Sequence, residues 1–207
     1  MKLLGNLNQG LLFVISGPAG TGKTTLVQML EEEFSCVKRS VTYTTRPQRE
    51  KEKHLDSYHF ISEEEFEKKI EEGFFLEHVK VFDHYYGTDK SIAEESLKTN
   101  NHVVLVIDTQ GLKILVEKNI PLISVFLSPP SHEELEARLK NRKTETEGQM
   151  LTRLKWSENE LEMIPWYDYH IINDDLITAY NVLRSIFIAE EHKAKRVGDY
   201  VFKKPKD

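Results

Sequence analysis

One short segment near the amino terminus restricts the possible folds more than any other: residues 17–25, with the sequence GPAGTGKTT. The preceding segment, 11–16, reads LLFVIS, and a short apolar run that ends at glycine is typical of a buried strand in a parallel sheet. The following segment, Thr24–Phe34, carries apolar residues at helical spacing and predicts an amphipathic helix. A strand, a glycine-rich turn and a helix in that order indicate an α/β fold.

The glycine-rich turn fits the pattern G-x-x-x-x-G-K-[ST] of phosphate-binding loops. Glycines let successive backbone N–H groups point into one concavity, and the helix N-terminus adds partial positive charge. The lysine of the pattern reaches the β- and γ-phosphates, and the hydroxyl after it can bind Mg²⁺. We expect this phosphate loop to bind a nucleoside triphosphate through Gly17, Pro18, Ala19, Gly20, Thr21, Gly22, Lys23, Thr24 and Thr25, with Thr24 also a metal ligand. The loop alone does not distinguish an ATPase, a GTPase and a kinase.

The rest of the chain alternates between strand and helix patterns. Apolar runs predict strands at 103–108, 122–128 and, more weakly, 169–173, and amphipathic segments predict helices at 62–73, 131–139 and 174–191. This alternation predicts an α/β P-loop NTPase core, with a parallel sheet flanked by helices, from about 10–42 and 91–190. Residues 43–90 lack long apolar runs and predict an inserted subdomain, 138–155 are polar and basic and predict a lid, and 191–207 predict a peripheral tail.

Length and charge narrow the function classes. The 207 residues suit a single domain, and the formal net charge of −6 argues against a broad nucleic-acid-binding surface. The single cysteine, Cys36, rules out an internal disulfide, and we expect a structural role for it rather than a nucleophilic one. The unbroken apolar run 11–15 is too short for a signal peptide or a membrane span. We expect a cytoplasmic protein with neither nucleic acid nor membrane as partner.

A second segment, 41–49, with the sequence VTYTTRPQR, places Arg46 and Arg49 three residues apart. Guanidinium groups bind phosphate through two parallel hydrogen bonds and remain charged. The alternative is a pair of surface arginines in a loop. If the pair binds a second phosphate, the chain is a kinase with an anionic acceptor rather than an ATPase that acts on water.

A set of motifs extends this pattern along the chain and resembles the guanylate kinase family. These are TTRPQR at 44–49, Tyr58, FFLEH at 74–78, HYYGT at 84–88, IDTQG at 107–111, SPPS at 128–131 and NDDL at 173–176. The resemblance covers about residues 10–190. It implies a P-loop core, a GMP-binding subdomain at about 43–90 and a helical lid. It also implies transfer of the γ-phosphoryl group of ATP to GMP, with Mg²⁺, giving ADP and GDP.

The resemblance further implies roles for individual residues. Arg46, Arg49, Tyr58 and Tyr86 would bind the GMP phosphate, and Thr42, Glu77 and Thr88 would bind the guanine base. Lys23, Arg138, Arg142 and Arg153 would stabilise the charge of the transferred group, Asn173 would lie near the adenine, and Asp108 would hold the water shell of the metal. Without the resemblance, the tyrosines could be core residues, Arg138 could pair with Glu134, Asn173 could cap the helix that follows it, and Asp108 could be a turn residue.

The chemistry of Glu77 can be argued independently. Guanine presents N1–H and N2–H₂ as adjacent donors, which one carboxylate accepts, whereas adenine presents an acceptor at N1. A site of this kind rejects the wrong base strongly, because buried polar groups are left unpaired. The apolar setting of Glu77, FFLEHV, argues against an idle exposed glutamate.

The chain departs from the family pattern at several positions. Val106 stands where the family usually has an acidic residue, Thr42 where it has serine, and Lys143 where it favours glycine, and glycines usual before Tyr58 are missing. Two other functions stay open: a different P-loop enzyme, and a phosphopeptide-binding module that has lost catalysis. Lys23, Thr24 and Arg142 argue against the module, and Glu77 with the paired arginines argues against another P-loop enzyme. The oligomeric state, monomer or homo-oligomer, is left open.

Overall fold

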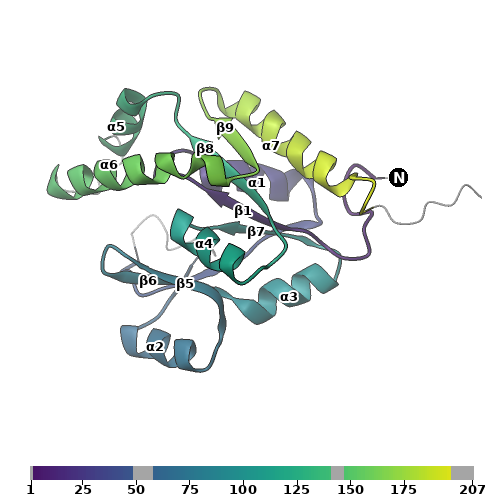
Figure 1. Ribbon diagram of the computed structural model, residues 1–207, viewed down its shortest axis with the longest axis horizontal. Helices are drawn as coiled ribbons and strands as arrows, with labels where there is room; N and C mark the ends of the chain where they lie inside the picture. Colours follow the sequence, from purple (N-terminus) through teal and green to yellow (C-terminus); the bar gives the residue numbers. More distant parts are fainter. Residues whose placement is uncertain (1, 49–57, 141–146, 197–207) are drawn as a thin grey trace, which may run out of the picture.

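The computed structural model describes residues 2–48, 58–140 and 147–196. Its main sheet has five strands in the order β2-β7-β1-β8-β9, and all neighbouring pairs are parallel (Figure 1). The strands are β1 (Leu12–Ser16), β2 (Val37–Arg39), β7 (His102–Val106), β8 (Ile123–Ser128) and β9 (Tyr169–Ile172). The parallel sheet and its flanking helices confirm the predicted α/β fold class, and the strands expected at 11–16, 103–108, 122–128 and 169–173 are all present.

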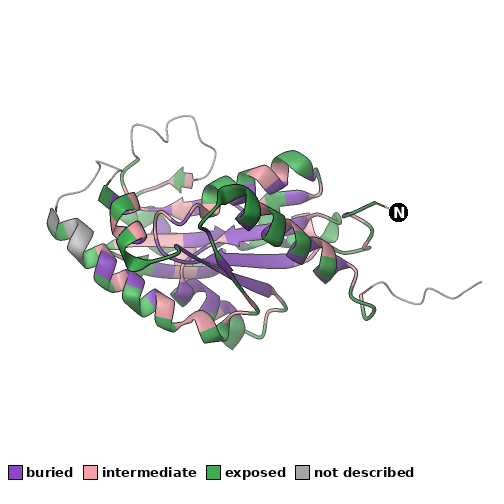
Figure 2. Cartoon of the chain, turned by 90° about the horizontal axis from the view of Figure 1, so that it is seen from above, coloured by how far each residue is buried: buried purple, intermediate pink, exposed green. Residues whose placement is uncertain are grey.

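Helices cover both faces of this sheet because the central strands are apolar on both sides. On one face α1 (Lys23–Glu33) and α7 (Leu176–Glu191) pack on Phe13 and Ile15, and Phe13 stacks on Phe187 with ring centroids 3.6 Å apart. On the other face α3 (Lys90–Lys98) and α4 (Thr109–Glu117) cover Leu12 and Val14. Figure 2 shows the buried strands between the largely exposed outer surfaces of the helices. Helices α3 and α4 were not expected from the sequence.

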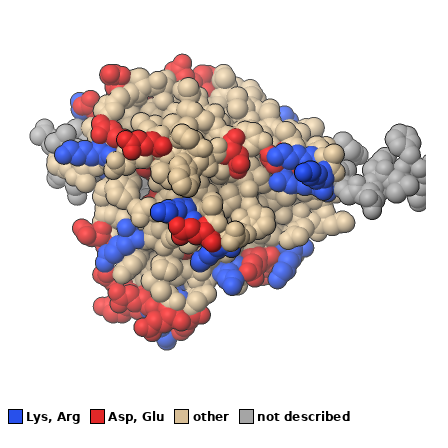
Figure 3. Space-filling model, viewed as in Figure 1, with Lys and Arg blue, Asp and Glu red and all other residues tan. Residues whose placement is uncertain are grey.

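Residues 42–89 contain a second sheet of four strands in the order β4-β3-β6-β5. The strands are β3 (Thr42–Thr44), β4 (Tyr58–Phe60), β5 (Phe75–Val81) and β6 (His84–Asp89), and α2 (Glu63–Glu71) packs Phe66 against rings of this sheet. Ser62 caps α2 by accepting a hydrogen bond from the Glu65 N–H, as its sequence predicts. The acidic run of α2 is a solvated surface, visible as the dense red patch in Figure 3.

Two helices follow β8 and lie against the phosphate loop. They are α5 (His132–Lys140) and α6 (Glu147–Glu162), and a short 3₁₀ helix, η2 (Ile164–Trp166), leads into β9. Leu135 and Leu139 of α5 and Leu154 of α6 form a small apolar cluster with Ala19 of the loop. Contact with Ala19 therefore ties this helix pair to the phosphate loop. Within the described residues, no helix is both long enough and apolar enough to cross a membrane.

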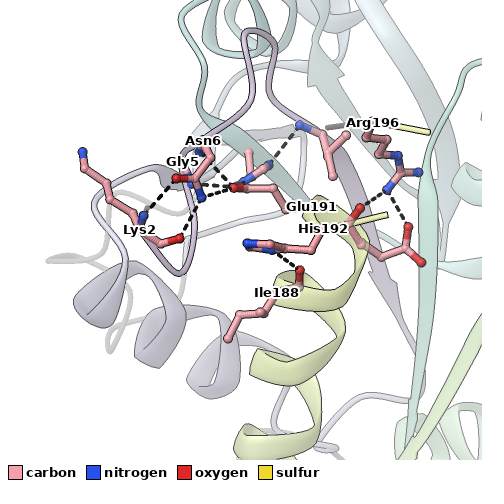
Figure 4. Close-up of polar contacts among 10 residues, drawn as sticks. Lys2, Gly5, Asn6, Ile188, Glu191, His192 and Arg196 are labelled. Atoms are coloured by element: carbon pink, nitrogen blue, oxygen red, sulfur yellow. Dashed lines mark hydrogen bonds and ion pairs between the residues drawn. The ribbon is translucent and has the colours of Figure 1, made fainter. Parts of the chain in front are cut away.

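A polar network joins the two ends of the described chain (Figure 4). Glu191, at the end of α7, accepts hydrogen bonds from the backbone N–H groups of Gly5 and Asn6 at 2.7 and 2.9 Å. Its carboxylate also lies 2.6 Å from Nε2 of His102, whose Nδ1 accepts from the Leu11 N–H. Because Nδ1 is an acceptor, Nε2 carries the proton and donates to Glu191. Glu191 opens the segment predicted to be a peripheral tail, but it is buried; residues 197–207 lie outside the described residues.

Candidate active site

The phosphate loop connects the buried strand β1 to the N-terminus of α1. At two positions of this loop, 17 and 22, the backbone conformation favours glycine and a larger residue would collide with a neighbour. Gly17 has φ 136°, and a Cβ there would lie 2.0 Å from the carbonyl oxygen of Leu127 on the neighbouring strand β8. Gly22 has φ 91°, and a Cβ there would lie 2.6 Å from Nδ2 of Asn173. Larger residues would push the loop away from the strand ends that hold it.

Lys23 folds back over the loop in this structure. Its Nζ donates to the carbonyl oxygens of Gly17 at 2.5 Å and Pro18 at 2.8 Å. Thr24 and Thr25 are exposed at the start of α1, and Thr21 is buried with its hydroxyl donating to the Pro18 carbonyl at 2.9 Å. The ammonium group thus lies on the loop itself, and the hydroxyl groups of Thr24 and Thr25 remain accessible to a ligand.

Asn173, directly after β9, holds the loop from the other side. Its Nδ2 donates to the Thr21 carbonyl at 2.8 Å, and its backbone N–H donates to the Ser128 carbonyl at 2.8 Å. The alternative role as cap of the following helix is wrong, because Asp175 caps α7 by accepting from the Thr178 N–H. Arg138 of α5 donates to the Asn173 carbonyl at 3.1 Å and to Glu134 at 2.6 Å, so the pairing with Glu134 considered from the sequence is present.

The strand register brings the expected acceptor residues to one face of the second sheet. Thr42 of β3 pairs with Tyr58 of β4 on one side and with Thr88 of β6 on the other. Two residues further along, Thr44 pairs with Tyr86. Because paired residues on neighbouring strands project to the same face, these side chains form one surface. Tyr43 and Gly87, between them, belong to the opposite face, where Tyr43 contacts Phe74 and Phe75.

Glu77 is buried next to Thr88. Only 1% of it is exposed, and the Thr88 hydroxyl donates to its Oε1 at 2.7 Å. Within the described part of the chain, its other oxygen, Oε2, is buried without a hydrogen-bond partner. Burial raises the pKa of this carboxyl to about 7, and the hydrogen bond from Thr88 offsets part of that effect. A buried carboxylate with one unsatisfied oxygen is prepared to accept donors from a ligand.

The arginines expected at the acceptor phosphate are only partly described. The Arg46 guanidinium lies over the rings of Tyr58 and Phe60, 5.3 and 5.5 Å from their centroids, and donates to the Pro47 carbonyl. Arg49 lies outside the described residues, and so does Arg142 of the expected lid. Arg153 of α6 lies 5.6 Å from the ring centroid of Phe82, at the turn between β5 and β6.

Asp108, after β7, combines a structural and a candidate ligand role. Its Oδ1 caps α4 by accepting from the Gly111 N–H at 2.9 Å. Among the described residues nothing hydrogen-bonds to its buried Oδ2, and burial raises the pKa of this carboxyl. The structural role and the expected metal-site role are therefore compatible, because Oδ1 caps the helix and Oδ2 is left for the water shell of a metal ion. Val106, where the family usually has an acid, packs against the core cluster beneath α1 and α7.

Glu160 of α6 was missed from the sequence. It is 5% exposed, and burial raises its pKa to about 7 while the charges of Lys23 and Arg153 lower it. It therefore brings a carboxylate from α6, beyond the predicted lid at 138–155, close to Lys23 of the phosphate loop and to Asp108. In the structure Glu160 continues the buried side of α6 after Leu154 and Ser157, but Ser157 is polar, so the sequence alone shows no apolar stripe that would have indicated its burial.

Comparisons with known proteins agree on one family. The model of the family described as guanylate kinase matches residues 9–190. A guanylate kinase of Protochlamydia amoebophila is 49% identical over 95% of this chain and 99% of its own length, and one of Caldanaerobacter subterraneus subsp. tengcongensis is 45% identical over 94% and 95%. The crystal structure of guanylate kinase from Anaplasma phagocytophilum superimposes with a TM-score of 0.75 at 31% identity, covering 92% of this chain and 90% of that one.

Proposed function

The chain belongs to the guanylate kinase family and is a nucleoside monophosphate kinase, and we propose how its own residues transfer the γ-phosphoryl group of ATP to GMP. The donor site is the phosphate loop, whose backbone N–H groups and helix N-terminus face the phosphates of ATP. Lys23 leaves the carbonyls of Gly17 and Pro18 and binds the β- and γ-phosphates instead. Asn173 keeps the loop in shape through its bond to Thr21.

The residues present fit a magnesium ion. Mg²⁺ prefers oxygen ligands and keeps several waters, and the site offers the exposed Thr24 hydroxyl and the unpartnered Oδ2 of Asp108 among the described residues. Thr24 would bind the ion directly and Asp108 through water. Held there, the ion would supply positive charge that offsets part of the charge of the phosphates. Asp108 also caps α4, which fixes the carboxylate in place for this task.

The acceptor site is the surface of the second sheet that carries Thr42, Thr88 and Glu77. Oε2 of Glu77, which has no hydrogen-bond partner among the described residues, would accept the N1–H and N2–H₂ donors of guanine together with Oε1. The two threonine hydroxyls would complete the contacts. At the other end of GMP, Arg46, Arg49, Tyr58 and Tyr86 would bind the phosphate. Adenine would leave the buried carboxylate facing its N1 lone pair, and the enzyme should therefore reject AMP.

The segment 138–155 would act as a lid over the two substrates. Arg138, Arg142 and Arg153 would place positive charge near the transferred group, and closure would exclude water and so prevent hydrolysis of ATP. The contact of α5 and α6 with Ala19 supports this placement. We propose that the chain acts in the cytoplasm on small-molecule substrates alone; monomer and homo-oligomer are both compatible with this proposal. The similarity to curated guanylate kinases gives no support to the phosphopeptide-binding alternative.

The observation that carries the proposed substrate site is the buried, half-satisfied carboxylate of Glu77. The purified protein with ATP and Mg²⁺ would be given GMP, AMP, UMP or CMP separately, and ADP release would be followed. We expect rapid ADP release with GMP alone. Saturable GMP binding without turnover would instead indicate a binding module.

The variant Glu77→Ala tests the assignment of the base site directly. We expect it to lose most of the preference for GMP over AMP, because the acceptor of the guanine donors is gone, while the KM for ATP stays near the wild-type value. Unchanged discrimination against AMP would remove Glu77 from the base site without affecting the assignment of the phosphate loop.

A further inference from the structure

Gly111 lies in the first turn of α4, where a side chain has no room. A Cβ placed there would lie 2.8 Å from Oε2 of Glu77 and 3.0 Å from Cδ1 of Ile107. Its φ is not in the left-handed region, so the backbone conformation does not require glycine. Glycine lowers helix stability relative to alanine. Space for the neighbouring side chains is therefore the reason for a glycine at this position.

The carboxylate next to Gly111 is confined on its other sides. Oε1 of Glu77 is bonded to the Thr88 hydroxyl of β6, and the residue before it, Leu76, accepts a hydrogen bond from Nζ of Lys118 at 2.7 Å. Lys118 directly follows α4, so α4 contacts β5 near its first turn, through Gly111, and just after its last residue, through Lys118. The Gly111 N–H donates to Asp108 and not to Glu77. Oε2 thus occupies space that a side chain at 111 would need, and it is free of hydrogen bonds within the described residues.

From this arrangement we propose that Gly111 is a specificity-determining position, whose missing side chain sets where the Glu77 carboxylate stands to meet guanine. Gly111 acts through Glu77 and is a positioning residue, so the inference rests on the proposed role of Glu77. A methyl group at 111 would meet the side chains of Glu77 and Ile107, and it displaces Oε2 of Glu77 because that atom is the nearest and Ile107 is packed in the core. The two guanine donors then no longer match the two carboxylate oxygens.

The test compares Gly111→Ala with wild type for GMP, AMP and ATP. We expect kcat/KM for GMP to fall by about 10- to 100-fold, mainly through KM, as for other displacements of about 1 Å in a binding site. The preference for GMP over AMP should fall by a similar factor, and the KM for ATP should change by about twofold or less. A merely structural role would change the amount of active enzyme and leave the selectivity ratio unchanged.

The matched control is Lys113→Ala, which changes an exposed side chain of the same helix and should alter neither substrate preference nor KM. If Gly111→Ala fails to fold, the double variant Gly111→Ala with Ile107→Val replaces it, because valine lacks the Cδ1 atom at 3.0 Å and leaves the contact with Glu77 in place.

The variant Glu77→Gln distinguishes a wrong role for Gly111 from a wrong role for Glu77 in binding guanine. If Gly111 acts through Glu77, adding Gly111→Ala to Glu77→Gln should reduce selectivity little further. If Glu77→Gln loses selectivity and Gly111→Ala keeps it, the role of Gly111 is refuted and that of Glu77 stands. If both variants keep full selectivity, the base site is assigned wrongly and the inference is overturned with it.

Discussion

Replacing Glu77 by glutamine should make the stability of the protein less dependent on pH. The pKa of the buried carboxyl is about 7 in the folded state against 4.5 as its ordinary value, so the folded state holds the proton more tightly than the unfolded state. The folding penalty is therefore absent well below pH 4.5, grows as the pH rises toward 7, and is complete above it. One pKa unit corresponds to about 1.4 kcal/mol, which gives a penalty of about 1 kcal/mol at pH 5 and about 3 kcal/mol at pH 8.

Glutamine has nearly the shape of glutamate and does not titrate in this range. The difference in unfolding free energy between Glu77→Gln and wild type should therefore shift by about 2.5 kcal/mol between pH 5 and pH 8, in favour of the variant at the higher pH. Urea unfolding of both nucleotide-free proteins, at several pH values and with equal m-values, measures this shift. Any effect of glutamine that is independent of pH cancels in the comparison. A difference that stays constant from pH 5 to pH 8 would show that the carboxyl titrates normally, and burial would then not govern its ionisation.

Three further predictions concern the reaction and the fold. GMP binding should weaken below pH 7, by up to about tenfold per pH unit, because guanine binds the ionised form of Glu77; calorimetry between pH 5.5 and 8 measures this, and a flat profile contradicts it. Lys23→Ala should abolish ADP release in the coupled assay yet leave GMP binding largely intact, and surviving turnover would mean that Lys23 has another role. Glu191→Ala should lower the unfolding free energy by about 3 kcal/mol, because it leaves His102 and the N–H groups of Gly5 and Asn6 without an acceptor; a loss under about 1 kcal/mol in urea unfolding would contradict this.

The parallel core could be predicted from the sequence because its strands are buried on both faces. Strands such as β1 and β8 are nearly continuous apolar runs, which are easily distinguished in the sequence from the charged segments that form helices. The second sheet could not be predicted in the same way. Strands β3 and β4 have three residues each, too few to show a period, and one face of this sheet carries threonines and tyrosines for a polar surface.

Contacts between distant segments explain what the sequence could not supply about the site. The bond from Asn173 to the Thr21 carbonyl spans 152 residues, so its role in holding the phosphate loop cannot be read from NDDL alone. Glu160 lies in a helix with only a narrow apolar stripe, and its burial depends on how α6 packs. The loop motif and Glu77 could be proposed from the sequence because each carries its chemistry in a local pattern. The pattern is a glycine-rich turn in one case and an acid within an apolar run in the other.

The network around Glu191 has a consequence for protein engineering. Because Glu191 holds Gly5 and Asn6 by direct hydrogen bonds, the beginning and the end of the described fold are neighbours in space. A short flexible linker can then join the two ends, and new ends can be opened in an exposed connection such as 118–119, between α4 and β8. In such a circularly permuted chain the phosphate loop would move from the beginning of the sequence to its second half, with every strand neighbour retained. The order in which the ribosome produces the core strands could thus be changed independently of the architecture that the strands build.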